Sequence, residues 1–114
     1  MRRELLRIEA LLRKHDFDAE ADLVATLLVE YDAPDSTRFR HALQDDAMWG
    51  GPGSVIDCSV VSSARVVTPE MRHDERAFRS AVVQLAEEMD RAGLGTPHSR
   101  EVAATFRSWL ALAE

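Results

Sequence analysis

The sequence predicts a mainly α-helical fold: about five helices in a compact bundle, with a glycine-rich turn and a short extended segment or hairpin between the third and fourth helices. Apolar residues recur three and four positions apart along most of the chain, which places them on one face of a helix. Prolines and glycines fall between these stretches, where they start or end helices. The chain has 114 residues, of which 46% are hydrophobic and 30% charged. This length and composition are typical of one globular domain, here expected to span residues 1–114.

The first two helices are predicted to form an antiparallel hairpin. The first runs from Arg2 to Lys14 and carries an apolar stripe. The second follows a short turn at residues 15–18 and reaches about Tyr31. Its expected buried face consists of Ala19, Leu23, Val24, Leu27, Leu28 and Tyr31. Because the connection is short, the two helices must lie side by side.

The middle of the chain combines a third helix with a turn and an extended segment. The third helix carries Phe39 and Leu43 and ends before Gly50, since Gly50-Gly51-Pro52-Gly53 cannot continue a helix. Residues 54–61 are rich in β-branched side chains, which favours a short strand or an extended segment. Residues 64–67 are its candidate partner in a small hairpin.

Two further helices complete the predicted fold, and each begins at a Thr-Pro pair. Threonine caps a helix start, and proline is tolerated at the first helical position. The fourth helix therefore starts at Thr68-Pro69 and ends at Gly93, and the last starts at Thr96-Pro97. Their apolar faces contain Phe78, Val82, Leu85 and Met89, then Val102, Phe106, Trp109 and Leu110.

Charge and composition exclude several classes of function. The formal net charge of −6 argues against nucleic-acid binding, which depends on dense basic patches. No apolar run approaches the ~20 residues that a membrane-spanning helix needs. Cys58 is the single cysteine, so no internal disulfide and no cysteine-based zinc cluster can form. We expect a cytoplasmic protein without a cofactor.

An acidic stretch supplies the leading functional hypothesis. Residues 16–37 contain acids and no Lys or Arg. Acids at helix starts complement the helix dipole, so a solvated face is one interpretation. The other is a docking surface for a basic protein, in a domain without catalytic activity. Under this hypothesis the partner-binding residues are Asp18, Asp22, Glu30, Asp45, Asp46 and Trp49. Trp49 is either the apolar anchor for the partner or a lid over the core.

Two alternatives come from other classes. A small enzyme or ligand-binding domain could use the Gly50–Asp57 turn, with Asp57, Cys58 and His73 converging on a pocket; burial would equally explain Cys58. A structural homodimer could form through apolar residues such as Val83 and Leu94. Glu70 and His73 have the spacing of a carboxylate-bridged metal half-site, but no second ExxH occurs, so we expect no metal site.

The run Met48-Trp49-Gly50-Gly51-Pro52-Gly53-Ser54-Val55-Ile56-Asp57 resembles a family of small bacterial proteins with an aromatic-GGxGS-xx-D motif. The resemblance implies a helical fold in which Gly50, Gly51, Gly53, Ser54 and Asp57 shape a structured turn. Some relatives sit among the immunity proteins of bacterial toxin systems. For this chain the resemblance therefore implies an immunity protein that covers a basic toxin domain with an acidic surface.

Overall fold

The computed structural model describes residues 1–34, 36–62 and 64–112 and shows a mainly α-helical bundle, as the apolar periodicity predicts. Its helices are α1 (Arg2–Lys14), α2 (Asp18–Tyr31), α3 (Ser36–Gln44), α4 (Asp46–Trp49), α5 (Pro69–Arg91) and α6 (Pro97–Leu112). A single 3₁₀ turn, η1 (Val55–Asp57), follows the glycine-rich segment. Within the described ranges, none of these helices is both long and apolar enough to cross a bilayer.

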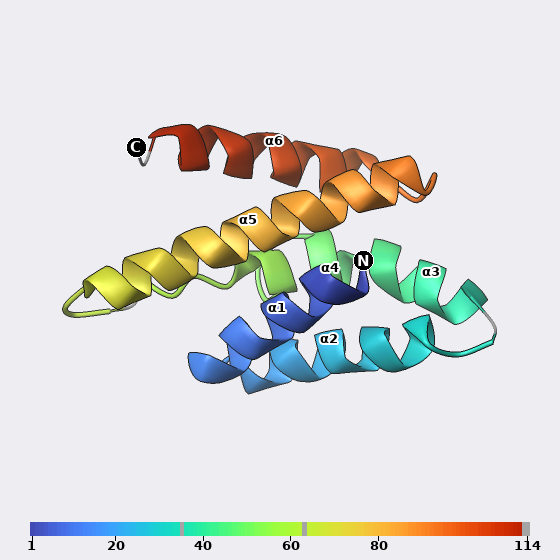
Figure 1. The fold of residues 1–114 in the computed structure, drawn as a ribbon, viewed down its shortest axis with the longest axis horizontal. Coiled ribbons are helices and arrows are strands. Elements are labelled where there is room, and N and C mark those ends of the chain that lie inside the picture. The colour runs from blue at the N-terminus through green and yellow to red at the C-terminus, as the bar shows by residue number, and fades with distance from the viewer. Residues whose placement is uncertain (35, 63, 113–114) are drawn as a thin grey trace.

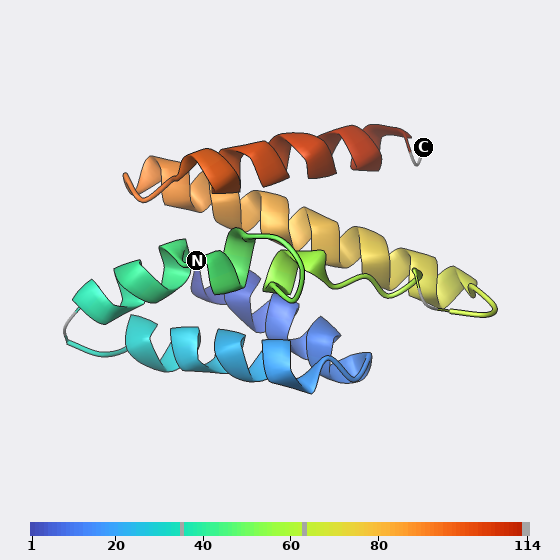
Figure 2. The same ribbon diagram turned by 180° about the vertical axis from the view of Figure 1, so that it is seen from behind.

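The 23-residue helix α5 lies between the two edges of the bundle (Figures 1 and 2). On one side it packs against α1, which pairs with α2 in the predicted hairpin. On the other side it packs against α6, and α6 otherwise meets only the short helix α4 to any extent. In both views α2 and α6 lie at opposite edges of the molecule. The outer helix α6 is therefore held almost entirely by α5.

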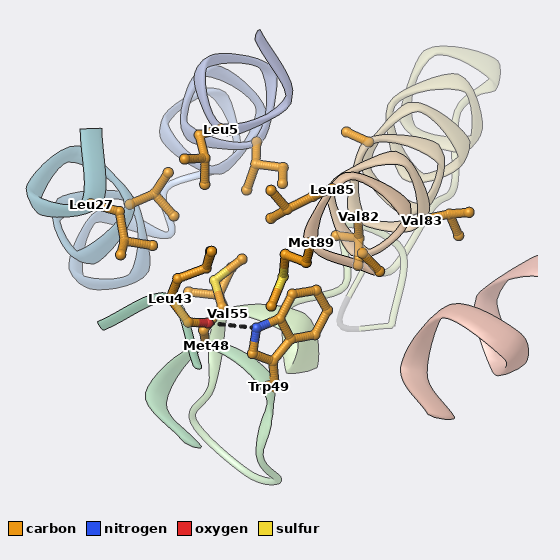
Figure 3. Close-up of a cluster of buried hydrophobic side chains, with 14 of the residues drawn as sticks. Leu5, Leu27, Leu43, Met48, Trp49, Val55, Val82, Val83, Leu85 and Met89 are labelled. Carbon is orange, nitrogen blue, oxygen red and sulfur yellow. Dashed lines mark hydrogen bonds between the residues drawn. The ribbon is translucent and has the colours of Figure 1, made fainter. Parts of the chain in front are cut away.

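Most of the buried apolar side chains lie on the α1–α4 side of α5 (Figure 3), and Ala103 and Phe106 of α6 extend the same cluster on the other side. Trp49 enters this cluster and is only 2% exposed. Its indole Nε1 donates a hydrogen bond of 2.7 Å to the carbonyl oxygen of Leu43. The bond satisfies a polar atom that would otherwise be costly to bury. The segment before the glycine turn is thereby fixed to the core.

The third predicted helix is divided into two at Asp45. Helix α3 ends at Gln44, and α4 starts at Asp46. Asp45 adopts an extended conformation, and its Oδ1 accepts a hydrogen bond of 2.8 Å from the amide of Ala47. Aspartate is a favourable N-cap because its side chain satisfies an amide that has no partner inside the helix. The break redirects the chain so that Met48 and Trp49 reach the core.

The predicted strand and hairpin at residues 54–67 are wrong. Residues 55–57 form a 3₁₀ turn, and no strand occurs in 58–62 or 64–67. The amide of Cys58 donates to the carbonyl of Val55, which closes the turn. The amide of Val61 donates to a carboxylate oxygen of Glu75 on α5 instead of to a neighbouring strand. The β-branched residues thus line an irregular segment anchored by a helix side chain.

Helix α6 begins with a reciprocal pair of side-chain hydrogen bonds. The amide of Ser99 donates to Thr96 Oγ1 at 3.0 Å, and the amide of Thr96 donates to Ser99 Oγ at 2.9 Å. This arrangement has the logic of a capping box, with serine in the position usually held by glutamate. Since Ser99 is fully buried, water cannot replace the lost partner.

We predict that Ser99→Ala lowers the free energy of unfolding by about 1–2 kcal/mol, because the amide of Thr96 loses its acceptor. Ser108→Ala is the matched control, since Ser108 is exposed in the same helix and alanine is a better helix former. Its effect should stay within about 0.5 kcal/mol of zero. Urea unfolding followed by circular dichroism measures both. Equal stabilities for the two variants would contradict the capping role.

Candidate functional site

A groove of about 650 Å³ lies between α6 and the chain segment that joins α4 to α5. In Figure 2 the green glycine turn lies in front of α5 and below α6. One wall of the groove is α6, and the other consists of residues from α4, the glycine turn and the segment 56–59. Glu75, Phe78 and Arg79 of α5 form the floor. We take this groove as the candidate site because apolar and ionisable side chains line it together.

The α6 wall is a continuous stripe of one helix face. It consists of His98, Glu101, Val102, Thr105, Phe106 and Trp109. These positions follow one another in steps of three and one, so they share one side of the helix. The stripe extends about 16 Å, since each residue advances a helix by 1.5 Å. The groove thus follows α6 for about three turns.

The opposite wall begins with the glycine turn. Gly51 and Gly53 adopt positive φ angles of 69° and 83°, which residues with a Cβ rarely adopt. Ser54 Oγ donates to the carbonyl of Gly51 at 2.7 Å, and the amide of Gly53 donates to Asp57 Oδ2 at 3.3 Å. Gly50 ends α4, where a Cβ would lie 3.0 Å from the Cβ of Asp46. The turn holds itself in shape and leaves Asp57 exposed at the rim of the groove.

The rest of that wall is attached to α5 through Glu75. One carboxylate oxygen of this buried residue, Oε2, accepts hydrogen bonds from Ser59 Oγ at 3.0 Å and from the Val61 amide at 2.9 Å. The other, Oε1, lies 3.7 Å from Arg79 Nη2. Buried carboxylates require such partners because desolvating a charge is costly. Glu75 therefore positions the wall and has little capacity left for a ligand.

Aromatic rings make one end of the groove apolar. Phe106 and Trp109 are stacked with their centroids 5.3 Å apart. The guanidinium carbon of Arg79 lies 4.7 Å from the centre of the Trp109 ring, a cation–π arrangement. Trp109 is nevertheless 44% exposed, although it is one of the largest apolar side chains of the protein. An exposed tryptophan inside a concave surface is typical of a binding site.

Carboxylates dominate the rim. Asp46, Asp57 and Glu101 are all exposed and line the groove. Asp46 lies 3.7 Å from His98 across the end of the groove. Arg79, which also lines the groove, is next to Glu75, so its positive charge is balanced internally. The groove accordingly presents three exposed negative charges around an apolar interior.

The structure separates the six residues predicted to bind a partner. Asp46 borders the groove, and Asp45 caps α4 beside it. Asp18, Asp22 and Glu30 lie on α2, at the opposite edge of the molecule from α6 (Figure 1).

Two more of these six residues, Asp22 and Trp49, have partners within the fold. Asp22 pairs with Arg13 of α1 at 2.9 Å, an exposed contact that links the first two helices. Trp49 is buried, so the anchor interpretation is wrong and the core interpretation is correct; only part of its surface contributes to the groove wall.

The residues of the catalytic alternative do not all meet. Asp57 and Cys58 line the groove, whereas the exposed His73 borders a separate hollow of about 440 Å³ on α5, next to Arg7 and Arg76. Burial, together with the negative charges of Glu20 and Asp57, raises the pKa of Cys58 to about 12. The thiol is therefore protonated at neutral pH, and the thiolate is the form that reacts.

The residues of the other two alternatives are also placed. Val83 and Leu94, suggested for a homodimer contact, are both buried within the chain, so they do not provide an exposed apolar face. Glu70 pairs with Lys14 at 2.7 Å instead of facing His73 across a metal site. Among the residues that the structure describes, no group of three or more His, Cys, Asp or Glu side chains has the arrangement of a metal site.

Sequence reasoning missed most of the groove. The stripe from His98 to Trp109 could have been predicted from the residue spacing in α6. It consists of three apolar residues of the expected face and of the polar residues next to them on the same side of the helix. The role of Glu75 had no sequence signal, because a glutamate in a long amphipathic helix is normally solvated. Its importance depends on the segment 59–61 folding back onto α5.

We predict that Glu75→Ala lowers the free energy of unfolding by about 1–3 kcal/mol and speeds hydrogen exchange at the Val61 amide. The variant removes the acceptor of two hydrogen bonds that attach the groove wall. Glu87→Ala is the control, because Glu87 on the same helix makes only a solvent-exposed ion pair with Arg107. Unchanged exchange at Val61 would show that the wall does not depend on Glu75.

We predict that Cys58 in the folded protein is alkylated roughly a thousandfold more slowly at pH 8 than in urea-unfolded protein, since its thiolate is correspondingly rarer. The raised pKa also stabilises the fold below pH ~9, and this contribution is lost as the pH rises toward 12. Iodoacetamide labelling followed by mass spectrometry measures the rate. Labelling of the folded protein at the unfolded rate would show that the pKa of Cys58 is not raised, and labelling faster than the unfolded rate would indicate an activated thiol and would revive the catalytic alternative.

Comparison of the chain with family models, with curated proteins and with solved structures finds no match. The resemblance of residues 48–57 to the aromatic-GGxGS-xx-D family stays a prediction. The groove and the chemistry of the residues that line it are consequently the basis for inferring a function.

Proposed function

We propose that this chain is a non-catalytic protein-binding domain that holds a basic segment of a partner protein in the α6 groove. One observation carries the proposal: a concave surface with an exposed tryptophan is bordered by three exposed carboxylates, Asp46, Asp57 and Glu101. Buried aromatic anchors supply much of the energy of protein interfaces. Carboxylates at the rim speed encounter with a basic partner and disfavour acidic ones.

The form of the groove supports a protein segment as the occupant. It is open along its length and follows three turns of α6, whereas a small-molecule site usually encloses most of its ligand. Its exposed charges lie at the rim and its apolar surface lies inside. This distribution is typical of a protein interface, which has an apolar centre and a polar border.

The resemblance of residues 48–57 to immunity-associated proteins is consistent with this proposal. A bacterial toxin that acts on nucleic acid would carry the basic surface that such a groove selects. Under this proposal the glycine turn has a structural role, because it presents Asp57 at the rim and forms one wall. Asp18 then belongs to a solvated, dipole-matched face, since it lies in the first turn of α2, and Asp22 is paired with Arg13.

We predict that removing two groove charges weakens capture of the partner about fivefold, and that removing two charges from α2 does not. The two variants are Asp57→Asn/Glu101→Gln and Asp18→Asn/Asp22→Asn, which change the net charge by the same amount. Each exposed charge contributes up to about 1 kcal/mol to such an interaction. Quantitative mass spectrometry of proteins co-purified with the tagged chain measures the ratio, at low and at physiological salt.

This comparison tests the proposal directly. A protein retained by the wild type and the α2 variant but depleted from the groove variant supports it. Equal depletion by the two variants would show that overall charge, not the groove, attracts the partner. A stronger loss with the α2 variant would restore the docking surface expected from the sequence.

A further inference from the structure

We infer that the segment held by the groove is an amphipathic α-helix of three or more turns that lies alongside α6 and carries basic residues on both flanks of its apolar face. This inference rests on the proposed function and specifies the conformation and the residue pattern of the partner. It follows from four properties of the groove: its length, the backbone around it, the packing of α6 and the placement of its charges.

The first property is the length and periodicity of the α6 wall. The stripe from His98 to Trp109 offers side chains in steps of three and one over about 16 Å. Side chains of a second helix at the same spacing can interdigitate with such a row. An extended segment has a period of two and a rise of about 3.3 Å, so its side chains would drift out of register with the wall.

The second property concerns backbone hydrogen bonds. Over residues 1–34, 36–62 and 64–112 the structure contains no strand and therefore no sheet edge. An extended partner would enter the groove with main-chain donors and acceptors that find no complementary backbone. A helix satisfies these groups internally and presents only side chains. The helix-in-groove mode of recognition is thus favoured over strand addition.

The third property is the incomplete packing of α6. This helix packs on α5 and touches α4 only slightly, whereas helices in a bundle usually have neighbours on two sides. A helix lying in the groove would become the second neighbour of α6. It would cover Phe106, Val102 and the exposed ring of Trp109, and Ile56 on the opposite wall.

The fourth property is the position of the unpaired charges. Asp57 stands on one wall and Glu101 on the other, so an incoming helix would meet a carboxylate on each flank. Glu101 has no ion-pair or hydrogen-bond partner among the described residues. Between them the floor pairs Arg79 with Glu75 and adds no net charge. The complementary helix has an apolar stripe with Lys or Arg on both sides.

Three synthetic peptides of about 18 residues test this inference. The first has leucines at helical spacing and lysines elsewhere. The second has the same composition with leucine and lysine alternating, and the third replaces the lysines of the first with glutamate. Each is titrated into ¹⁵N-labelled protein, and the indole NH signals of Trp109 and Trp49 and the amides of residues 98–109 are followed by NMR.

The inference predicts that the helical lysine peptide shifts the Trp109 indole signal and binds at least roughly tenfold more tightly than the alternating or the glutamate peptide. Its affinity should fall roughly tenfold in the Thr105→Arg variant, because Thr105 lies in the middle of the α6 wall. Ser108→Arg is the matched control, since Ser108 is exposed in the same helix but does not line the groove. Circular dichroism confirms that each variant is folded.

The outcomes separate the inference from the proposed function. If both lysine peptides bind equally tightly and Thr105→Arg weakens both, the groove binds basic segments but does not select a helix, and the inference is wrong. If neither lysine peptide shifts Trp109, or if Thr105→Arg and Ser108→Arg act alike, the groove is not a site for basic segments and both proposals fail. If the glutamate peptide binds as tightly as the helical lysine peptide, the charges at the rim do not select the partner, and the basic pattern inferred for the helix is wrong.

Discussion

The packing of α6 almost entirely on α5 is the constraint on which the site depends. The main core lies on the other side of α5, where α1, α2, α3, α4 and η1 surround Leu85 and Met89 (Figure 3). Within the part of the chain that the structure describes, no comparable layer covers α6, and its contact with α5 uses buried residues such as Ala103 and Phe106. The stripe of α6 residues from His98 to Trp109, next to this contact, lines the groove. A domain of this size buries a smaller fraction of its surface than a larger one does, and here α6 lies at the edge of the core.

Two buried acidic residues of α5, Asp74 and Glu75, attach other parts of the chain to this helix. Asp74 accepts contacts from Lys14 and His15, both at 2.8 Å, and these groups hold the pKa of Asp74 below its ordinary value. They join the end of α1 to α5. The next residue, Glu75, attaches the irregular segment after η1. Two consecutive acidic residues of α5 thus bind different parts of the chain. Glu75 is the one that positions the groove wall.

The helices could be predicted from the sequence because their signals are local. Thr68-Pro69 caps α5, with Thr68 Oγ1 accepting a hydrogen bond from the Met71 amide, as its position before a proline predicts. The segment 54–67 was predicted incorrectly because β-branched residues favour a strand only when a partner strand exists, and here Glu75 takes the Val61 amide. Trp49 was ambiguous because burial of an indole depends on a hydrogen-bond acceptor, here the Leu43 carbonyl, and the sequence alone does not show how the chain bends at Asp45. The candidate site joins residues from α4, the glycine turn, α5 and α6, so no local pattern could have assembled it.

The acidic residues on α2 and those around the α6 groove, at opposite edges of the molecule, have different electrostatic surroundings. On α2, Asp18 lies in the first turn and Asp22 lies beside Arg13, so the helix dipole and a cation already compensate these two acids, whereas Glu30 lies in the last turn. At the groove, Asp57 and Glu101 face each other across an apolar surface, and the nearby cation Arg79 is balanced by Glu75. Uncompensated like charges around a concave, low-dielectric surface repel one another, and a cationic occupant relieves that repulsion. The same apolar surface gains stability when Trp109 is covered. Electrostatics and burial therefore favour the same occupant at the groove, whereas on α2 the charges of Asp18 and Asp22 are already compensated.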